Sequence, residues 1–218
     1  MKIGIIGTGG MASAFAAQWL AAGHEVRIGG RDLAAAKTLV AGLDADHGGT
    51  AAHGGIPDAV EFGEAVLLAV PHDAAPAILA ALPEPALRGR TLIDPTNPVV
   101  EGFTLATAGG PSAAQRIAAA APTAHVVKAF NLCHEGVWRL TPPVFDGRPL
   151  GVPLAGDDEA ALIRVRELVR DLGCEPYAAG GLERAGLLEA TAAVLIGLWV
   201  GEGVDAQAIA PPLTHAAG

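Results

Sequence analysis

The opening stretch of the chain, residues 2–12, constrains the fold more than any other part of the sequence. A short apolar run is followed at once by Gly7, Gly9 and Ala12, which gives the spacing G-x-G-x-x-A between an expected strand and an expected helix. Gly7 permits a tight turn, Gly9 lets the backbone approach a pyrophosphate, and Ala12 lets the helix pack close to the strand. The amide groups that begin the helix would then face the phosphates. The alternative to a dinucleotide site is a plain glycine-rich turn.

Apolar runs alternate with helical patterns along the rest of the chain, which predicts an α/β fold with a doubly wound, mostly parallel sheet of the Rossmann type. The run at residues 65–70 is continuously apolar, as expected for a parallel strand that is buried on both faces. Further strands are expected at residues 3–6, 24–29, 91–94, 125–130, 152–155 and 175–178, with a short one near 50–52. Helices are expected at residues 10–22, 33–41, 72–82 and 112–120, and from about 157 to 172.

The chain is expected to have two parts. Residues 1–180 would form the dinucleotide-binding domain, and residues 181–218 would form a small C-terminal helical extension. The apolar segment 187–200 is too short, and with Glu189 too interrupted, for a convincing membrane span, so we interpret it as a core or subunit-interface helix. This extension would complete the site for the second substrate, the hydride acceptor, and would form the contact of a homodimer. Residues 204–218 are expected to be a loosely ordered tail.

Charge and cysteine content exclude several functional classes. Only 17% of the 218 residues are charged and the formal net charge is −9, so neither nucleic acid nor an anionic membrane is an expected partner. Cys133 and Cys174 lack metal-ligand spacing, so we expect neither a metal site nor a disulfide framework. No signal peptide precedes the first strand, and a cytoplasmic location is expected.

The residues after the second strand favour NADP over NAD. NAD sites place a carboxylate there for the ribose 2′-hydroxyl, whereas this chain has Gly30 followed by Arg31. Glycine leaves room for a 2′-phosphate, and the guanidinium can pair with it and stack on adenine. Lys37 is a further candidate for the phosphate, and Asp32 is interpreted as a helix N-cap. The alternative for Arg31 is an ordinary solvated charge.

Polar residues follow three other strands, at the edge where ligands bind in doubly wound sheets. Pro71 and His72 should line the cofactor cleft, although His72 could equally cap the helix after it. Asn97 lies in a stiff turn between two prolines and could form hydrogen bonds with a carboxamide such as nicotinamide. The alternative is that its side chain forms hydrogen bonds only within the turn. Asn131 and His134 form the third group, and His134 is a candidate proton donor.

Several nearby residues are given structural interpretations. Cys133 could be a reactive thiol, but a small apolar cysteine is favoured because the sequence places no base beside it. Residues 135–150 form a long Pro/Gly/aromatic loop, which is either a lid or a covering segment. His47 and His53 are interpreted as loop residues and not as ligands.

These features, in this order, resemble the NADPH-dependent reductases of the deazaflavin coenzyme F420, the F420:NADP oxidoreductase-like group. The resemblance covers nearly the whole chain. The matching blocks are residues 7–11, 22–26, 30–32, 68–71, 93–98, 127–131 and 155–158, with Gly180, Leu182, Leu188 and Glu189.

The resemblance implies a set of cofactor contacts. Thr8, Arg31 and Lys37 would contact the NADP phosphates, whereas Pro71, Asn97 and Ala129 would lie near the nicotinamide. The candidate NADP(H)-binding residues come from the glycine-rich turn, from the strand ends and from this resemblance. They are Gly7, Thr8, Gly9, Gly10, Met11, Gly30, Arg31, Lys37, Val70, Pro71, His72, Asn97, Ala129 and Asn131.

The resemblance also implies a reaction, a direct hydride transfer between NADPH and a planar redox coenzyme. F420 is the first expected partner, and FMN or another flavin is the second. Such a transfer mainly requires that two flat rings be positioned, so it needs no obligatory side-chain acid. The alternatives are an NADPH-dependent reductase of a small carbonyl or imine substrate, with His134 or His72 as proton donor, and a non-catalytic NADPH-binding protein.

Overall fold

The structure is a computed structural model that describes residues 1–43, 49–206 and 209 of the chain. The interpretation of His47 lies outside the described residues, as does most of the expected tail.

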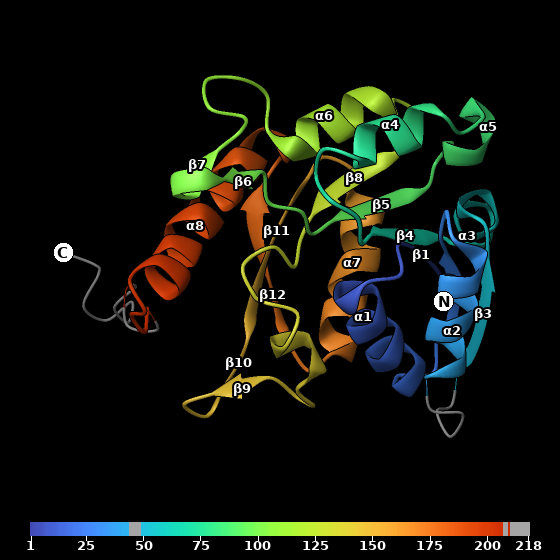
Figure 1. The fold of residues 1–218 in the computed structure, drawn as a ribbon, viewed down its shortest axis with the longest axis horizontal. Coiled ribbons are helices and arrows are strands. Elements are labelled where there is room, and N and C mark those ends of the chain that lie inside the picture. The colour runs from blue at the N-terminus through green and yellow to red at the C-terminus, as the bar shows by residue number, and fades with distance from the viewer. Residues whose placement is uncertain (44–48, 207–208, 210–218) are drawn as a thin grey trace.

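An eight-stranded sheet forms the centre of the molecule, in the order β12-β11-β8-β5-β4-β1-β2-β3 (Figure 1). From β3 to β8 the neighbouring strands are all parallel, and β11 then pairs antiparallel with β8. The predicted doubly wound, mostly parallel sheet is therefore confirmed, with its switch point between β1 and β4. The strands are β1 (Lys2–Ile6), β2 (Glu25–Gly29), β3 (Thr50–Gly54), β4 (Ala65–Leu68), β5 (Thr91–Asp94), β8 (His125–Lys128), β11 (Gly151–Gly156) and β12 (Glu175–Gly180).

Helices cover both faces of this sheet, which is why β4 and β5 are buried along their whole length. Alternate residues of β1 face the two cores: Ile3 and Ile5 pack on one side, and Ile6 packs on the other. One face carries α1 (Gly10–Ala21), α2 (Leu33–Ala41) and α7 (Glu159–Asp171), and the other carries α3 (Ile56–Phe62), α4 (Ala75–Ala80), α5 (Glu84–Leu87) and α6 (Ala113–Ala120).

The segment after β8 is a covering segment, one of the two expected alternatives. Trp138, in the single turn η2 (Val137–Arg139), is 2% exposed and packs on Phe15 of α1 and on Phe130, with ring centroids 5.3 and 5.4 Å away. This aromatic contact holds the segment on the first helix. A small hairpin follows, made of β9 (Val144–Phe145) and β10 (Arg148–Pro149).

The C-terminal part begins with the turn η3 (Leu182–Arg184), continues as α8 (Ala185–Ile196) and ends in the π-helical turn η4 (Gly197–Gly201). It packs against α6, β11 and a small hairpin of β6 (Val99–Val100), η1 (Glu101–Phe103) and β7 (Thr104–Leu105) (Figure 1). The stretch Leu182–Gly201 has the length and apolar composition of a membrane span, with a mean hydropathy of 1.4. In this structure, however, Glu189 in its middle is fully buried among charged groups of the protein interior.

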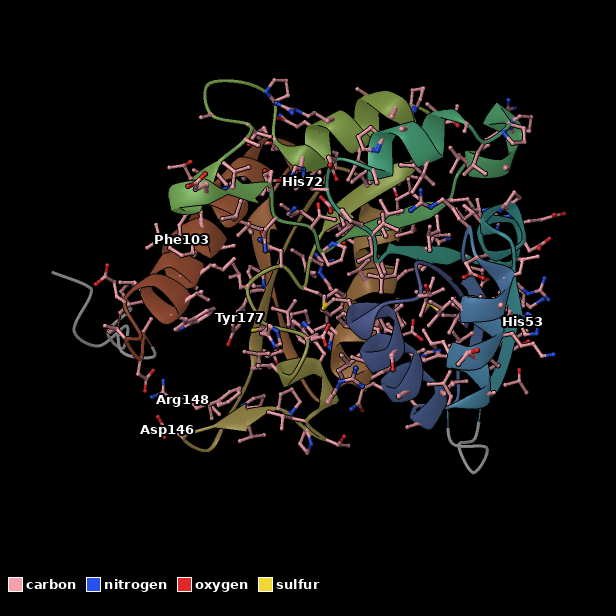
Figure 2. All side chains as sticks on the ribbon, viewed as in Figure 1. His53, His72, Phe103, Asp146, Arg148 and Tyr177 are labelled. Atoms are coloured by element: carbon pink, nitrogen blue, oxygen red, sulfur yellow. The ribbon has the colours of Figure 1, made fainter. Side chains whose placement is uncertain are left out.

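Two local predictions differ from the structure. His53 lies in β3 and not in a loop, and Figure 2 shows it at the far edge of the sheet. The predicted helix 72–82 is shorter, because α4 spans only Ala75–Ala80. The helix α3 has no apolar period that predicts it, and its start is instead stabilised by the Asp58 carboxylate, which accepts a hydrogen bond from the Gly55 amide at 2.7 Å.

Candidate functional site

Two cavities lie along the edge of the sheet where β1, β2, β4, β5 and β8 end. The smaller has a volume of about 610 Å³ and lies over the glycine-rich turn and the end of β2. The larger has a volume of about 1880 Å³ and extends from Met11 and Asn97 to Tyr177 and to Trp199 near the C-terminal end of the helical extension. Figure 2 shows Tyr177, Arg148 and Asp146 grouped at one end of this larger cavity.

The glycine-rich turn has the geometry that the sequence predicts. Gly7 has a φ of +125°, and a Cβ atom on it would lie 2.0 Å from the carbonyl oxygen of Ala69. Gly9 immediately precedes α1, and apart from Gly9 and its chain neighbours no heavy atom of the described residues lies within 4 Å of the position that its Cβ would take. The backbone is therefore open to a ligand at Gly9, at the N-terminus of α1, where amide groups and the helix dipole favour an anion.

The end of β2 forms one wall of the small cavity, where Gly30 and Arg31 both lie. A side chain on Gly30 would meet Thr8, whose Cγ2 lies 2.9 Å from the ideal Cβ position. Asp32 is the N-cap of α2, as predicted, because its carboxylate accepts hydrogen bonds from the amides of the helix at 2.8 and 3.1 Å. Arg31 is exposed at this cavity, whereas Lys37 is exposed on α2 and lines neither cavity.

The residues after β4 divide between the cavity and the protein surface. Val70 and Pro71 line the small cavity, as expected. His72 is half-buried and lines neither of the two cavities (Figure 2). It does not cap α4 either, because the N-cap is Ala74 and makes no side-chain capping bond. The geometry therefore supports neither interpretation of His72.

Asn97 and Asn131 form a reciprocal pair on the wall of the large cavity. The Asn97 amide donates to the Asn131 carbonyl at 2.6 Å, and the Asn131 amide donates to Asn97 Oδ1 at 2.9 Å and to the Leu188 carbonyl of α8 at 3.0 Å. Asn131 is 3% exposed, and its Oδ1 is a buried acceptor without a hydrogen-bond partner in the described part of the chain. An unsatisfied buried oxygen is costly, so this atom fits a ligand that brings an N–H group.

A strained residue turns the chain toward this pair. Phe130 has a φ of +62°, which is rare for a bulky side chain and costs on the order of 1–3 kcal/mol. Its ring is held between Phe15 and Trp138, and this packing offsets the strain. Ala129, expected near the nicotinamide, has its methyl group fully buried in the core and does not line the cavity.

Next to this wall lies a cluster of three fully buried charges. Lys128 Nζ lies 2.9 Å from Asp94 and 3.1 Å from Glu189, and it also donates to the Thr96 carbonyl. Glu189 accepts hydrogen bonds from the first two amides of α6 at 3.0 and 3.2 Å. One ammonium and the N-terminus of α6 thus compensate two carboxylates. Sequence reasoning gave this cluster no role, although its signal was present as single charged residues at otherwise apolar positions of β5, β8 and α8.

The remaining candidates lie on the segment after β8. His134 lines the large cavity, is exposed, and accepts a hydrogen bond from the Gly136 amide at 3.2 Å. Burial raises the pKa of the Cys133 thiol to about 11, so this group is protonated near neutral pH and is a poor nucleophile. Burial, and to a lesser extent Cys133, raises the pKa of Cys174 to about 12. The described residues contain no group of three metal-ligating side chains.

A known family model matches the amino-terminal part of the chain, which contributes part of this site. Residues 2–98, from β1 to the Asn97 turn, match the family model described as NADP oxidoreductase, coenzyme F420-dependent. The predicted resemblance to F420-dependent NADP oxidoreductases is confirmed over this range, and so is the predicted class of enzyme, an NADP-dependent oxidoreductase.

Solved structures extend the likeness to most of the chain. One, a "putative f420 dependent nadp-reductase" from Arthrobacter sp. FB24, is 27% identical, with a TM-score of 0.80 over 94% of this chain and 96% of its own. The hypothetical protein SMa0349 from Sinorhizobium meliloti is also 27% identical, with a TM-score of 0.72 over 85% and 88% of the two chains. A reductive aminase from Aspergillus terreus, 24% identical with a TM-score of 0.66, shares the fold over 92% of this chain and 62% of its own. A search of the curated proteins finds no match.

The family model and the large cavity cover different parts of the chain. The F420-dependent NADP oxidoreductase model includes the glycine-rich turn, Arg31 and Asn97, which form the small cavity and one corner of the large one. Most residues that line the large cavity follow residue 98. The family match therefore covers the residues around the small cavity, and most of the wall of the large cavity lies outside the matched range.

Proposed function

We propose that the protein transfers a hydride between NADPH and a planar redox coenzyme, with the deazaflavin F420 as the first candidate and FMN or another flavin as the second. The observation that carries this proposal is that the two cavities lie on either side of the N-terminus of α1, one lined by Gly9 and the other by Met11. The first is lined by open backbone and by Arg31, as a phosphorylated adenosine requires, and the other is large enough for two flat rings.

The small cavity fits the adenosine half of NADPH. The open backbone at Gly9 would receive the pyrophosphate, and Arg31 would pair with the 2′-phosphate. The family description supports the choice of NADP. Lys37 lies outside the cavity wall, so its contact with the phosphate remains a prediction that would require its long side chain to reach over α2.

The large cavity fits the nicotinamide together with an acceptor. Its volume of about 1880 Å³ exceeds the roughly 300–1,000 Å³ that is typical of a site for one small molecule. Asn131 Oδ1, buried and unpartnered, would accept a hydrogen bond from the nicotinamide carboxamide, while Asn97 keeps the Asn131 amide in place. NADPH would supply the hydride, and the chain's own contribution would be to hold the two rings in contact and exclude water.

The proposal is tested by NADPH oxidation assays with F420, with FMN and without an acceptor, side by side. Acceptor-dependent oxidation with F420 or FMN supports it. Tight NADPH binding without oxidation by any planar acceptor would contradict it and would favour a non-catalytic NADPH-binding protein.

A second candidate is an NADPH-dependent reductase of a small carbonyl or imine substrate, and it is favoured by the position of His134 on the wall of the large cavity. Such a substrate needs a proton donor, and of the two histidines considered from the sequence only His134 lies there. His134→Ala should abolish most turnover under this candidate. Under hydride transfer between two coenzymes, the same variant should keep most of its turnover.

A further inference from the structure

The carboxylate of Glu135 occupies an unusual position, against the first residue of α1. A Cβ atom built on Gly10 would lie 1.9 Å from Glu135 Oε2 and 2.2 Å from its carboxyl carbon. The carboxylate therefore fills the space where residue 10 would otherwise carry a side chain. Glu135 lines the large cavity together with Met11, Asn97 and Asn131, and it does not line the small cavity.

No side chain neutralises this carboxylate. Glu135 is half-buried and makes no hydrogen bond or ion pair with any described residue, from residue 1 to 43 or from 49 onward. Arg139, the nearest cation along the segment, donates instead to the Gly10 carbonyl at 3.2 Å. His134, the neighbouring residue, is engaged with the Gly136 amide. A half-buried charge without a partner is unfavourable.

Such a charge gains a function if the bound ligand supplies its partner. In the proposed reaction, the C4–H bond of the dihydronicotinamide breaks and both bonding electrons leave with the hydrogen, which forms a new bond to the acceptor ring: a C–H bond in a deazaflavin, or an N–H bond in a flavin. The nicotinamide ring that remains carries one positive charge. A carboxylate on the wall that holds Asn97 and Asn131 would interact favourably with this charge, and the effective dielectric of a half-enclosed site makes the interaction stronger than it is in water.

We infer that Glu135 is a specificity-determining residue that favours the oxidised cofactor, NADP⁺, over NADPH. By stabilising the product charge it makes bound NADPH a better hydride donor, so the site is biased toward reduction of the acceptor. This inference rests on the proposed function, because it requires the nicotinamide to lie in the large cavity.

The test compares the dissociation constants of NADP⁺ and NADPH, measured by calorimetric titration without an acceptor. Glu135→Gln keeps the shape of the side chain and removes its charge. Gly10→Ala keeps the charge and displaces it, because the new Cβ would fall on the carboxylate. Glu167→Gln, an exposed residue on α7, is the control for the change in net charge.

For Glu135→Gln we expect NADP⁺ to bind roughly threefold to tenfold more weakly, with a change of less than about twofold for NADPH. Gly10→Ala should shift the ratio of the two constants in the same direction, and Glu167→Gln should leave it unchanged. An unchanged ratio in Glu135→Gln would overturn the inference. Equal tightening of both cofactors would also overturn it, since it would place the carboxylate beside the pyrophosphate. If the unaltered protein binds neither nucleotide, the proposed function itself fails.

Discussion

Arg31 is the residue on which the proposed preference for NADPH over NADH mainly depends. It lies exposed on the wall of the small cavity, directly after Gly30, and Asp32 is already engaged as the N-cap of α2. Arg31→Ala should weaken NADPH binding by about 1–3 kcal/mol, the scale of a charge-assisted hydrogen bond, and should hardly affect NADH. Fluorescence titration with both cofactors measures this, and Arg27→Ala, on β2 outside both cavities, serves as the control. Equal losses for NADPH and NADH would contradict the assignment.

The two cysteines lead to a prediction about pH. Burial raises the pKa of Cys133 to about 11 and that of Cys174 to about 12, compared with 9.0 in the unfolded chain. The folded state therefore binds these protons more tightly, and its stability should fall as the pH rises from 9 toward 11 and 12. Near pH 8 both thiols should react slowly with Ellman's reagent in the native protein and rapidly after unfolding. Rapid reaction of Cys133 in the native protein would show that it is the reactive thiol.

The sequence predicted individual residues well where a local spacing carries the chemistry. Gly7, Gly9 and Arg31 belong to one short motif and its following strand, and the structure places them as expected. Prediction from the sequence failed for residues whose role depends on a partner that is distant along the chain. Neither Glu135 against Gly10 nor Lys128 between two carboxylates can be found from spacing, because each contact joins parts of the chain that only the fold brings together.

At the scale of the elements, α8 is attached to the sheet through a buried polar cluster. Lys128 on β8 joins Asp94 on β5 to Glu189 on α8, and Glu189 also caps α6. Lys128→Met should lower the free energy of unfolding by about 3–5 kcal/mol, because it leaves two buried carboxylates without a cation. Urea denaturation measures this loss, with Lys2→Met, at the exposed first residue of β1, as the control.

A second variant separates a charge effect from a packing effect in this cluster. Glu189→Gln in the Lys128→Met background removes one of the two uncompensated charges, so it should restore part of the lost stability. Purely additive losses in the double variant would show that the cluster contributes through packing and not through charge.

The helices and strands that could be predicted from the sequence are the longer ones, whose apolar residues follow a clear pattern. The strands β1 to β5 and β8 and the helices α1, α2 and α6 were expected within a few residues of their observed bounds. The hairpins β6–β7 and β9–β10 were not expected, because strands of two residues carry no alternation. The antiparallel pairing of β11 with β8 was likewise invisible, since a buried apolar strand reads the same in both directions.

At the scale of the whole molecule, the described residues leave the outer face of α8 and η4 uncovered. Leu187, Val194 and Val200 are 56%, 57% and 73% exposed, although they belong to a mainly apolar helix. Phe103 of the β6–β7 hairpin lies beside this helix and is 37% exposed (Figure 2). Apolar surface of this kind is typical of a subunit contact, and we propose that the protein is a homodimer through this face.

The dimer proposal predicts a defined response to charge. Val194→Glu should convert the dimer to a monomer, because two copies of the carboxylate would be buried at a twofold contact without partners. Light scattering coupled to size-exclusion chromatography gives the mass directly. Ile163→Glu, equally exposed on α7 at 55%, should leave the dimer intact. A monomer before any substitution would refute the proposal.

The central claim is that NADPH binds along the carboxyl edge of the sheet, with its 2′-phosphate on Arg31, its pyrophosphate at Gly9 and its nicotinamide beside Asn97 and Asn131. A crystal structure with saturating NADPH tests this most directly. The account predicts continuous density for the cofactor from the small cavity into the large one, with a hydrogen bond from the carboxamide to Asn131 Oδ1. A small cavity that stays empty, or that is closed by side chains at saturating NADPH, would contradict it.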